Sequence, residues 1–255
     1  MSSDFLHDAE LDGPMGKPRR AWKSRVAKIL AITAIPILLF RLSTTAYDEA
    51  RVAARRAWCT SNLKQIALAL SHYAEAYGAL PPAHTVDANG RPLHSWRTLI
   101  LPYLEESTLY QSIDLSKPWN HPVNARAHAE MPSVYRCRMV SRPTNSTSFL
   151  AIVGPEGCFL PDRPRLKSEI MDDPRFTISL IEVDEEHAVP WMAPIDTDST
   201  ALMTIGPSSN SHHPGGANVA FADGNAYFLP AKTSFEIRRK LLTIAGGEPI
   251  HGAEF

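Results

Sequence analysis

The sequence predicts an α+β fold in which one long helix packs on an antiparallel β-sheet. Residues 46–77 contain neither proline nor glycine, and their apolar side chains recur at steps of three and four, which places them on one helical face. Several β-rich runs bounded by turn residues follow in the second half of the chain. A long first helix, an irregular aromatic-rich region, later strands and a terminal helix together indicate the α+β class.

The composition sets the scale of the molecule. The chain has 255 residues, of which 44% are hydrophobic, and a formal net charge of -1. This length is enough for one sizeable core or two small ones, and the charge gives no indication of a nucleic-acid partner. Residues 1–24 combine a polar start with a cluster of lysine and arginine, so we expect a disordered basic tail in the cytoplasm.

Residues 25–45 are expected to form a membrane anchor. The unbroken apolar run from Ile29 to Phe40 has twelve residues, fewer than the ~20 that a span needs, but Lys28 and Arg41 at its ends can extend their charges to the headgroups. A cleaved secretory signal and a buried helix are the alternatives. The first two interpretations both place residues 46–255 outside the cytoplasm, in the periplasm.

The long helix is expected to serve as the spine of the folded domain. Gly78 and Pro81 end it. One face carries an apolar stripe, which we expect to be buried against the strands, while Lys64, Ser71 and Glu75 face away. The stripe residues are Cys59, Leu63, Ile66, Leu70 and Tyr73.

Strands are predicted at residues 148–153, 177–183 and 217–229. The last of these is the clearest hairpin, with a two-residue turn at Asp223-Gly224. Such a turn sets Phe221 opposite Ala226 and Val219 opposite Phe228, with all four on one face. Between residues 95 and 113 we expect two short helices broken near Pro102, and Thr233 to Glu236 is a capping box that opens a final helix.

Several short motifs resemble a large bacterial family of pilin-like proteins of unknown function. They include Asn62-Leu-Lys-Gln, Ser95-Trp-Arg, Leu101-Pro-Tyr-Leu-Glu, Tyr135-Arg-Cys, Val153-Gly-Pro, Val189-Pro-Trp and a box from His213 to Gly224. In this last box nine residues lie between a histidine and Asp-Gly, as in the C-terminal signature of that family. The resemblance covers roughly residues 26–250.

The resemblance implies the plan of a type IV pilin or pseudopilin. Half of the first helix would be a membrane anchor and half the spine of a sheet domain, and the partners would be the inner membrane and other pilin-like subunits or secretion components. The chain departs from the family at the prepilin peptidase site. Gly16 is followed by Lys17 and Pro18, and the apolar run contains no acidic residue. A permanent anchor is therefore the simpler expectation for this segment.

No catalytic, cofactor or metal motif accompanies these features. The sequence lacks HExxH, Cys-x-x-Cys, G-x-S-x-G and a phosphate-binding glycine loop. The box from His213 to Gly224 is expected to specify structure, because a strand between His213 and Asp223 would separate them. In this interpretation Gly224 supplies a positive φ angle, Asp223 supplies turn hydrogen bonds, and His213 holds the loop before the strand.

Three cysteines remain. Outside the cytoplasm thiols tend to pair, and Cys59 and Cys137 lie in motifs shared with the pilin-like family, whereas Cys158 does not. A Cys59–Cys137 disulfide is one possibility, and a small buried hydrophobe on the helix stripe is the other for Cys59.

Two functions are consistent with these observations. The first is a membrane-anchored pilin-like structural or assembly protein of a secretion or fibre system. The second is an extracytoplasmic binding module that takes a polymer or small ligand on a surface formed by Trp96, Trp119 and Trp191. An open apolar groove at these tryptophans would favour the second function, and their burial would favour the first.

Overall fold

The computed structural model describes residues 18–137, 145–206, 213–247 and 249–250. Gly16, Lys17 and most of the expected N-terminal tail lie outside these residues. The first helix begins at Pro18, within the expected tail of residues 1–24. A proline fits the first helical position, where its missing N–H has no helical partner to lose.

The described chain is an α+β protein. Its helices are α1 (Pro18–Tyr77), α2 (Trp96–Leu99), α3 (Ser107–Gln111), α4 (Ala125–Ala129), α5 (Ser199–Met203) and α6 (Phe235–Lys240), and its 3-10 turns are η1 (Leu101–Leu104), η2 (Pro122–Asn124), η3 (Ser133–Tyr135), η4 (Lys167–Glu169) and η5 (Pro174–Phe176). The strands are β1 (Ala79–Leu80), β2 (His84–Val86), β3 (Pro92–Ser95), β4 (Ser146–Thr147), β5 (Phe149–Ala151), β6 (Arg165–Leu166), β7 (Ile178–Glu182), β8 (Val189–Pro190), β9 (Gly216–Phe221) and β10 (Ala226–Pro230).

The chain divides into two units, residues 1–51 and 52–255. Of the first unit, the structure describes a helical segment, the part of α1 from Pro18 to Arg51. No helix in the described part of the chain is both long and apolar enough to cross a membrane.

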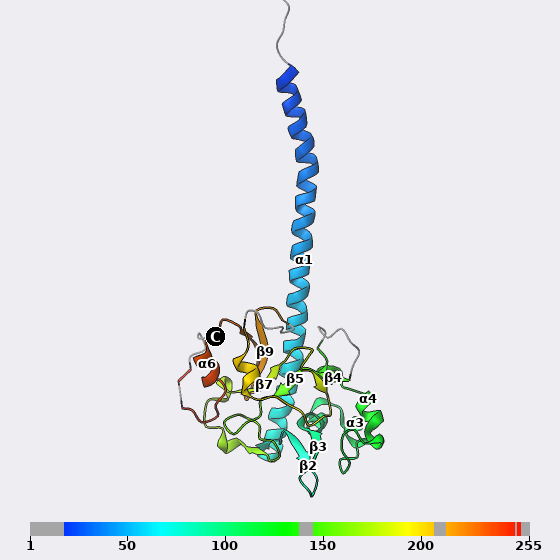
Figure 1. Cartoon of the computed structure of the whole chain (residues 1–255), viewed down its shortest axis with the longest axis vertical. Helices are drawn as coiled ribbons and strands as arrows, with labels where there is room; N and C mark the ends of the chain where they lie inside the picture. Colours follow the sequence, from blue (N-terminus) through cyan, green and yellow to red (C-terminus); the bar gives the residue numbers. More distant parts are fainter. Residues whose placement is uncertain (1–17, 138–144, 207–212, 248, 251–255) are drawn as a thin grey trace, which may run out of the picture. The chain divides into compact units, whose positions relative to one another are not determined.

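The second unit is built on a four-stranded antiparallel sheet with the order β10-β9-β7-β5 (Figure 1). One face packs on α1, where Leu63 and Leu70 share a buried core with Leu180 and Ala220 of the central strands. The stripe lies as its spacing predicts: Cys59, Leu63, Ile66 and Leu70 are buried and Tyr73 is partly buried.

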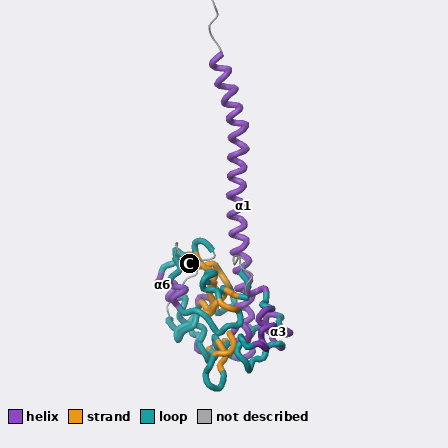
Figure 2. Tube along the Cα trace, turned by 45° about the vertical axis from the view of Figure 1, so that its right-hand side comes forward, coloured by secondary structure: helices purple, strands orange, loops and turns teal. Residues whose placement is uncertain are grey.

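The opposite face of the sheet packs on the short helices α5 and α6. Helix α6 is labelled in Figure 2. Ile181, Val219 and Phe221 form a second core there with Leu202 and Leu241. Successive residues of a strand point to opposite faces, so β7 and β9 contribute to both cores.

The aromatic-rich region between α1 and the sheet is held by one buried ion pair. Nη2 of Arg97 lies 2.7 Å from Oδ1 of Asp196. The same carboxylate oxygen accepts hydrogen bonds from Nε1 of Trp96 and from the backbone N–H of Ala151 in β5. Asp196 thus joins α2 to the edge strand of the sheet.

The hairpin of β9 and β10 has a three-residue loop, so the expected two-residue turn is wrong. The N–H of Phe221 donates to the carbonyl of Asn225, and Ala226 pairs with Ala220. The N–H of Gly224 donates to the carbonyl of Phe221, and Gly224 has φ +88°, as in a type I turn completed by a left-handed residue.

This loop shifts the register by one residue from the expected one. Tyr227 is opposite Val219 and Phe228 is opposite Asn218, so Phe221 and Phe228 point to opposite faces. At the far end of the hairpin, a Cβ at Gly216 would clash with the carbonyl oxygen of Leu229, so the two strands leave no room there for a side chain.

Replacing Gly224 with valine is expected to destabilise the fold by about 1–3 kcal/mol, because a β-branched residue is strained at a positive φ angle. Gly154→Ala is the control, since Gly154 has no positive φ angle and a Cβ there meets nothing within 4 Å. Urea unfolding of the two variants measures the difference. Equal midpoints would show that the turn does not require a left-handed residue.

The final helix begins one residue later than the capping box suggested. Ser234, not Thr233, is the N-cap, and its hydroxyl accepts a hydrogen bond from the N–H of Ile237. The helix ends at Lys240, and Leu241 at its C-cap and Ile244 beyond it are buried.

Candidate functional site

Four side chains with metal-binding or redox chemistry converge beside α1. They are Cys59 of α1, Cys137 just after η3, Glu182 at the end of β7, and His213 shortly before β9. Each is at most 3% exposed, and one potential ligand atom from each lies within 4.8 Å of the others. We call these four residues the Cys-Glu-His cluster.

Direct contacts link the members of the cluster in two pairs. Sγ of Cys59 lies 2.8 Å from Sγ of Cys137, and Nε2 of His213 lies 3.2 Å from Oε2 of Glu182. The structure therefore places Cys59 and Cys137 side by side, as a disulfide between them would require. Their sulfur atoms are not bonded, and no disulfide is present among the described residues.

A hydrogen-bond network holds the carboxylate of Glu182 in the cluster. Nδ2 of Asn218 donates to Oε2 of Glu182 at 2.6 Å, and the hydroxyl of Thr60 donates to Oδ1 of Asn218 at 2.8 Å. Asn218 is in β9 and Thr60 follows Cys59 in α1. The network thus fixes the carboxylate between the helix and the sheet.

The protonation states follow from burial and from these contacts. Burial alone would raise the pKa of Glu182, but the hydrogen bonds and charge of His213, with Cys137 and Asn218, hold that pKa below its usual range. Burial opposes the charge on His213, yet its bonds to Cys137 and Glu182 raise its pKa to about 9. The hydrogen bond to Cys59, followed by burial, raises the pKa of the Cys137 thiol.

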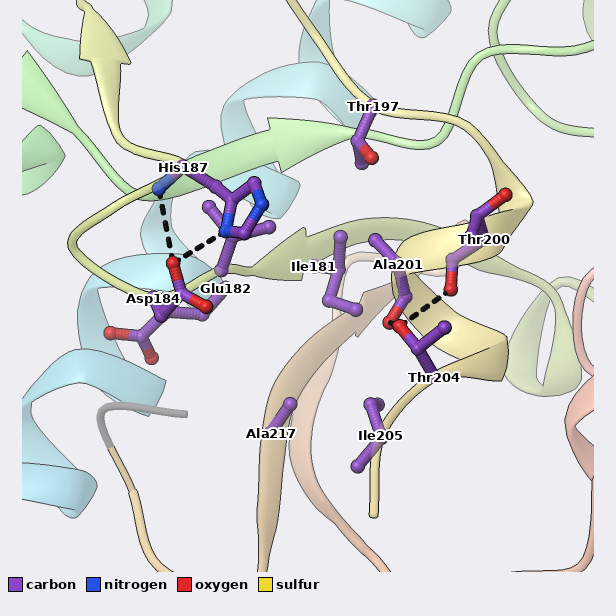
Figure 3. Close-up of a pocket in the computed structure, with 11 residues that line it drawn as sticks. Ile181, Glu182, Asp184, His187, Thr197, Thr200, Ala201, Thr204, Ile205 and Ala217 are labelled. Atoms are coloured by element: carbon purple, nitrogen blue, oxygen red, sulfur yellow. Dashed lines mark hydrogen bonds and ion pairs between the residues drawn. The ribbon is translucent and has the colours of Figure 1, made fainter. Parts of the chain in front are cut away.

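Strand alternation explains why Glu182 belongs to this site. Leu180 and Glu182 point toward α1, whereas Ile181 between them points to the second core. Figure 3 shows the carboxylate of Glu182 turned away from Ile181 and Ala201. A charged side chain on the buried face of a strand requires a partner, and His213 is that partner.

A cavity of about 240 Å³ lies on the other side of β7 (Figure 3). Its inner wall is apolar, with Ile181, Ile205 and Ala217. The hydroxyl of Thr204 at its edge donates to the carbonyl of Thr200 in the same helix. His187 and Asp184 bond to one another at an exposed rim. Thr204 and His187 thus bond to other residues of the cavity wall, whereas four side chains with ligand chemistry meet in the Cys-Glu-His cluster, which is therefore the stronger candidate site.

The histidine and the aspartate of the box from His213 to Gly224 lie in different places in the structure. Asp223 lies in the hairpin turn, where its carboxylate accepts hydrogen bonds from the backbone and side chain of Asn225. His213 lies in the cluster with Glu182. The carboxylate partner of His213 comes from a different strand, 31 positions earlier in the chain.

The proposed ligand surface of Trp96, Trp119 and Trp191 is also wrong. Trp96 and Trp191 are fully buried, and Trp119 is partly buried against the first core. The indole N–H of Trp191 donates to the carbonyl of His128, so its polar atom is satisfied inside the fold. These rings are packing elements.

Sequence reasoning missed Glu182 and Asn218. A signal for Glu182 was present, because it is the only charged residue in the run Thr177-Ile-Ser-Leu-Ile-Glu-Val, which reads as a buried strand. The donor set of the cluster, two thiols, an imidazole and a carboxylate, is one that ions such as Zn²⁺ accept.

Residues 48–157 match the model of a family described as a protein of unknown function, DUF1559. The matched region includes Cys59 and Cys137 and ends before Glu182 and His213. Searches of curated proteins and of solved structures found no match.

Proposed function

We propose that this chain is a pilin-like structural or assembly subunit of a secretion or fibre system, and that it associates through the N-terminal segment of α1. The proposal rests on the difference in burial between two parts of α1. Its side chains Cys59, Leu63, Ile66 and Leu70 belong to the core of the folded unit, whereas the large apolar side chains that the structure describes before residue 43 are exposed.

Among its described residues, this segment exposes large apolar side chains on two opposite faces. Ile35, Leu38 and Leu42 lie on one face and Ile37 and Phe40 on the opposite one, with exposed fractions of 55–67%. A helix with apolar side chains on opposite faces is normally covered by other structure. We assign that cover to the corresponding helices of other pilin-like subunits, including further copies of this chain.

Two further observations support this assignment. The antiparallel sheet packed on the second half of α1 has the layout that the family resemblance implies. The burial of Trp96 and Trp191 removes the observation on which the binding-module alternative depended. The predicted location, at the inner membrane with residues 46–255 in the periplasm, remains a prediction that protease accessibility in spheroplasts would test.

Cysteine cross-linking tests the association. Leu38→Cys in the full chain is expected to give covalent dimers on mild oxidation in cells, because helices that pack on this segment bring two copies of position 38 together. Asp48→Cys, on the same helix and also exposed, is the control and is expected to cross-link less. The wild-type chain gives the background from its own three cysteines, which are buried.

The competing explanation is that lipid covers the segment. If Leu38→Cys stayed monomeric under oxidation while the chain floated with lipid vesicles, the subunit assembly proposed here would be wrong. Dimers of Leu38→Cys that exceed those of Asp48→Cys would support it.

A further inference from the structure

We propose that the Cys-Glu-His cluster is a structural metal site that binds one Zn²⁺ ion through Sγ of Cys59, Sγ of Cys137, a ring nitrogen of His213 and a carboxylate oxygen of Glu182. This inference does not depend on the proposed function, because it rests on the folded unit alone.

The ligand types and their number fit this ion. Structural zinc sites take four ligands from cysteine, histidine and carboxylate side chains in a tetrahedral arrangement. The cluster offers four such side chains, one potential ligand atom from each, and all four residues are buried. Because no side is open to solvent, the site has no position for a reacting water and is suited to holding structure together.

The distances require only small movements. Bonds of about 2.0–2.3 Å place the ligand atoms of a tetrahedral zinc site about 3.3–3.8 Å apart. The present separations range from 2.8 Å between the two sulfur atoms to at most 4.8 Å across the cluster. Adjustments of about 1 Å, within the reach of side-chain rotation, would complete the site.

Metal ligands bind in their deprotonated forms, so zinc displaces the protons of the thiols and of the imidazole. Two thiolates, a carboxylate and a neutral imidazole then carry three negative charges, which Zn²⁺ reduces to one. The hydrogen bond from Asn218 to Glu182 is a supporting contact of the kind that orients metal-binding carboxylates.

A Cys59–Cys137 disulfide is the competing use of the same atoms. It would join only two of the four groups and leave Glu182 and His213 as a buried ion pair, an arrangement that seldom stabilises a fold. A metal ion engages all four groups and ties together α1, β7 and the segments before β9 and after η3.

Metal analysis of the full chain, purified with reductant and Zn²⁺, tests the site. We expect about one zinc per chain in the wild type and a loss of most of it in Cys137→Ser and in His213→Ala. Cys158→Ser is the matched control, because Cys158 is equally buried but lies outside the cluster, and it is expected to keep the ion. Co²⁺ in place of Zn²⁺ should give the visible absorption of a four-coordinate thiolate site.

If a variant of a zinc-binding residue fails to fold, the wild-type chain still tests the proposal when its zinc is removed with a chelator. Removal of zinc is expected to lower the Tm, and added Zn²⁺ is expected to restore it. A wild-type chain without bound zinc, with a Tm that neither chelator nor Zn²⁺ changes, would overturn the proposal. A Cys59–Cys137 disulfide found by peptide mass spectrometry of the unreduced protein from its native compartment would overturn it as well.

Discussion

Replacing Asp196 with alanine is expected to lower the free energy of unfolding by about 3–5 kcal/mol. Both members of the Arg97–Asp196 pair are buried, and removal of the carboxylate leaves the guanidinium without its counter-ion. Burial lowers the pKa of Arg97, and the neighbouring Asp196 offsets only part of that effect. The variant also leaves the indole N–H of Trp96 and the backbone N–H of Ala151 without their acceptor.

Chemical denaturation of Asp196→Ala and Glu130→Ala measures this difference. Glu130 pairs with Arg126 at 2.9 Å, but the two side chains are 53% and 90% exposed. An exposed pair of this kind contributes at most about 1 kcal/mol. If the two variants lost similar stability, the Arg97–Asp196 pair would not be the main link between α2 and the sheet.

Replacing Leu70 with alanine is expected to cost about 2–5 kcal/mol, through lost transfer energy and the cavity that remains. Leu70 is 3% exposed in the core between α1 and the sheet. Leu68 is in the same helix, two positions away, and is 48% exposed. Leu68→Ala therefore tests the same substitution, with the same helix propensity, away from the core.

The prediction concerns the difference between the two alanine variants, measured as the change in urea midpoint at constant m-value. Only a much larger loss for Leu70→Ala agrees with α1 as the spine of the folded unit. Comparable midpoints would mean that the helix face was assigned incorrectly.

The main elements could be predicted because their signals are local. The spacing of Leu63, Ile66 and Leu70 defines a helix face by itself, and the strands at 149–151, 178–182 and 216–230 lie within or close to the predicted runs. Asp223-Gly224 marks a turn, but it fits both a two-residue and a three-residue loop. Choosing between them requires the pairing of Phe221 with Asn225, which the packing of both cores decides.

The candidate site could be predicted only in part, because its members come from separate segments. Shared motifs suggested that Cys59 and Cys137 are neighbours, and the structure places their sulfur atoms together. No spacing rule connects His213 with Glu182, since the order of β7 and β9 in the sheet brings them together. The tryptophans were misassigned because a large amphipathic ring has the same appearance in a sequence whether it is buried or binds a ligand.

The close approach of β9 and β10 at Gly216 restricts the amino acids that the chain tolerates. A side chain there meets the carbonyl oxygen of Leu229, which belongs to the backbone and cannot rotate away. In a selection of folded variants from a library randomised at this codon, we expect glycine to be recovered almost exclusively. At Gly154, where a Cβ meets nothing within 4 Å, the same selection should return alanine and serine as well. The hairpin thus sets a substitution profile that a single sequence does not reveal.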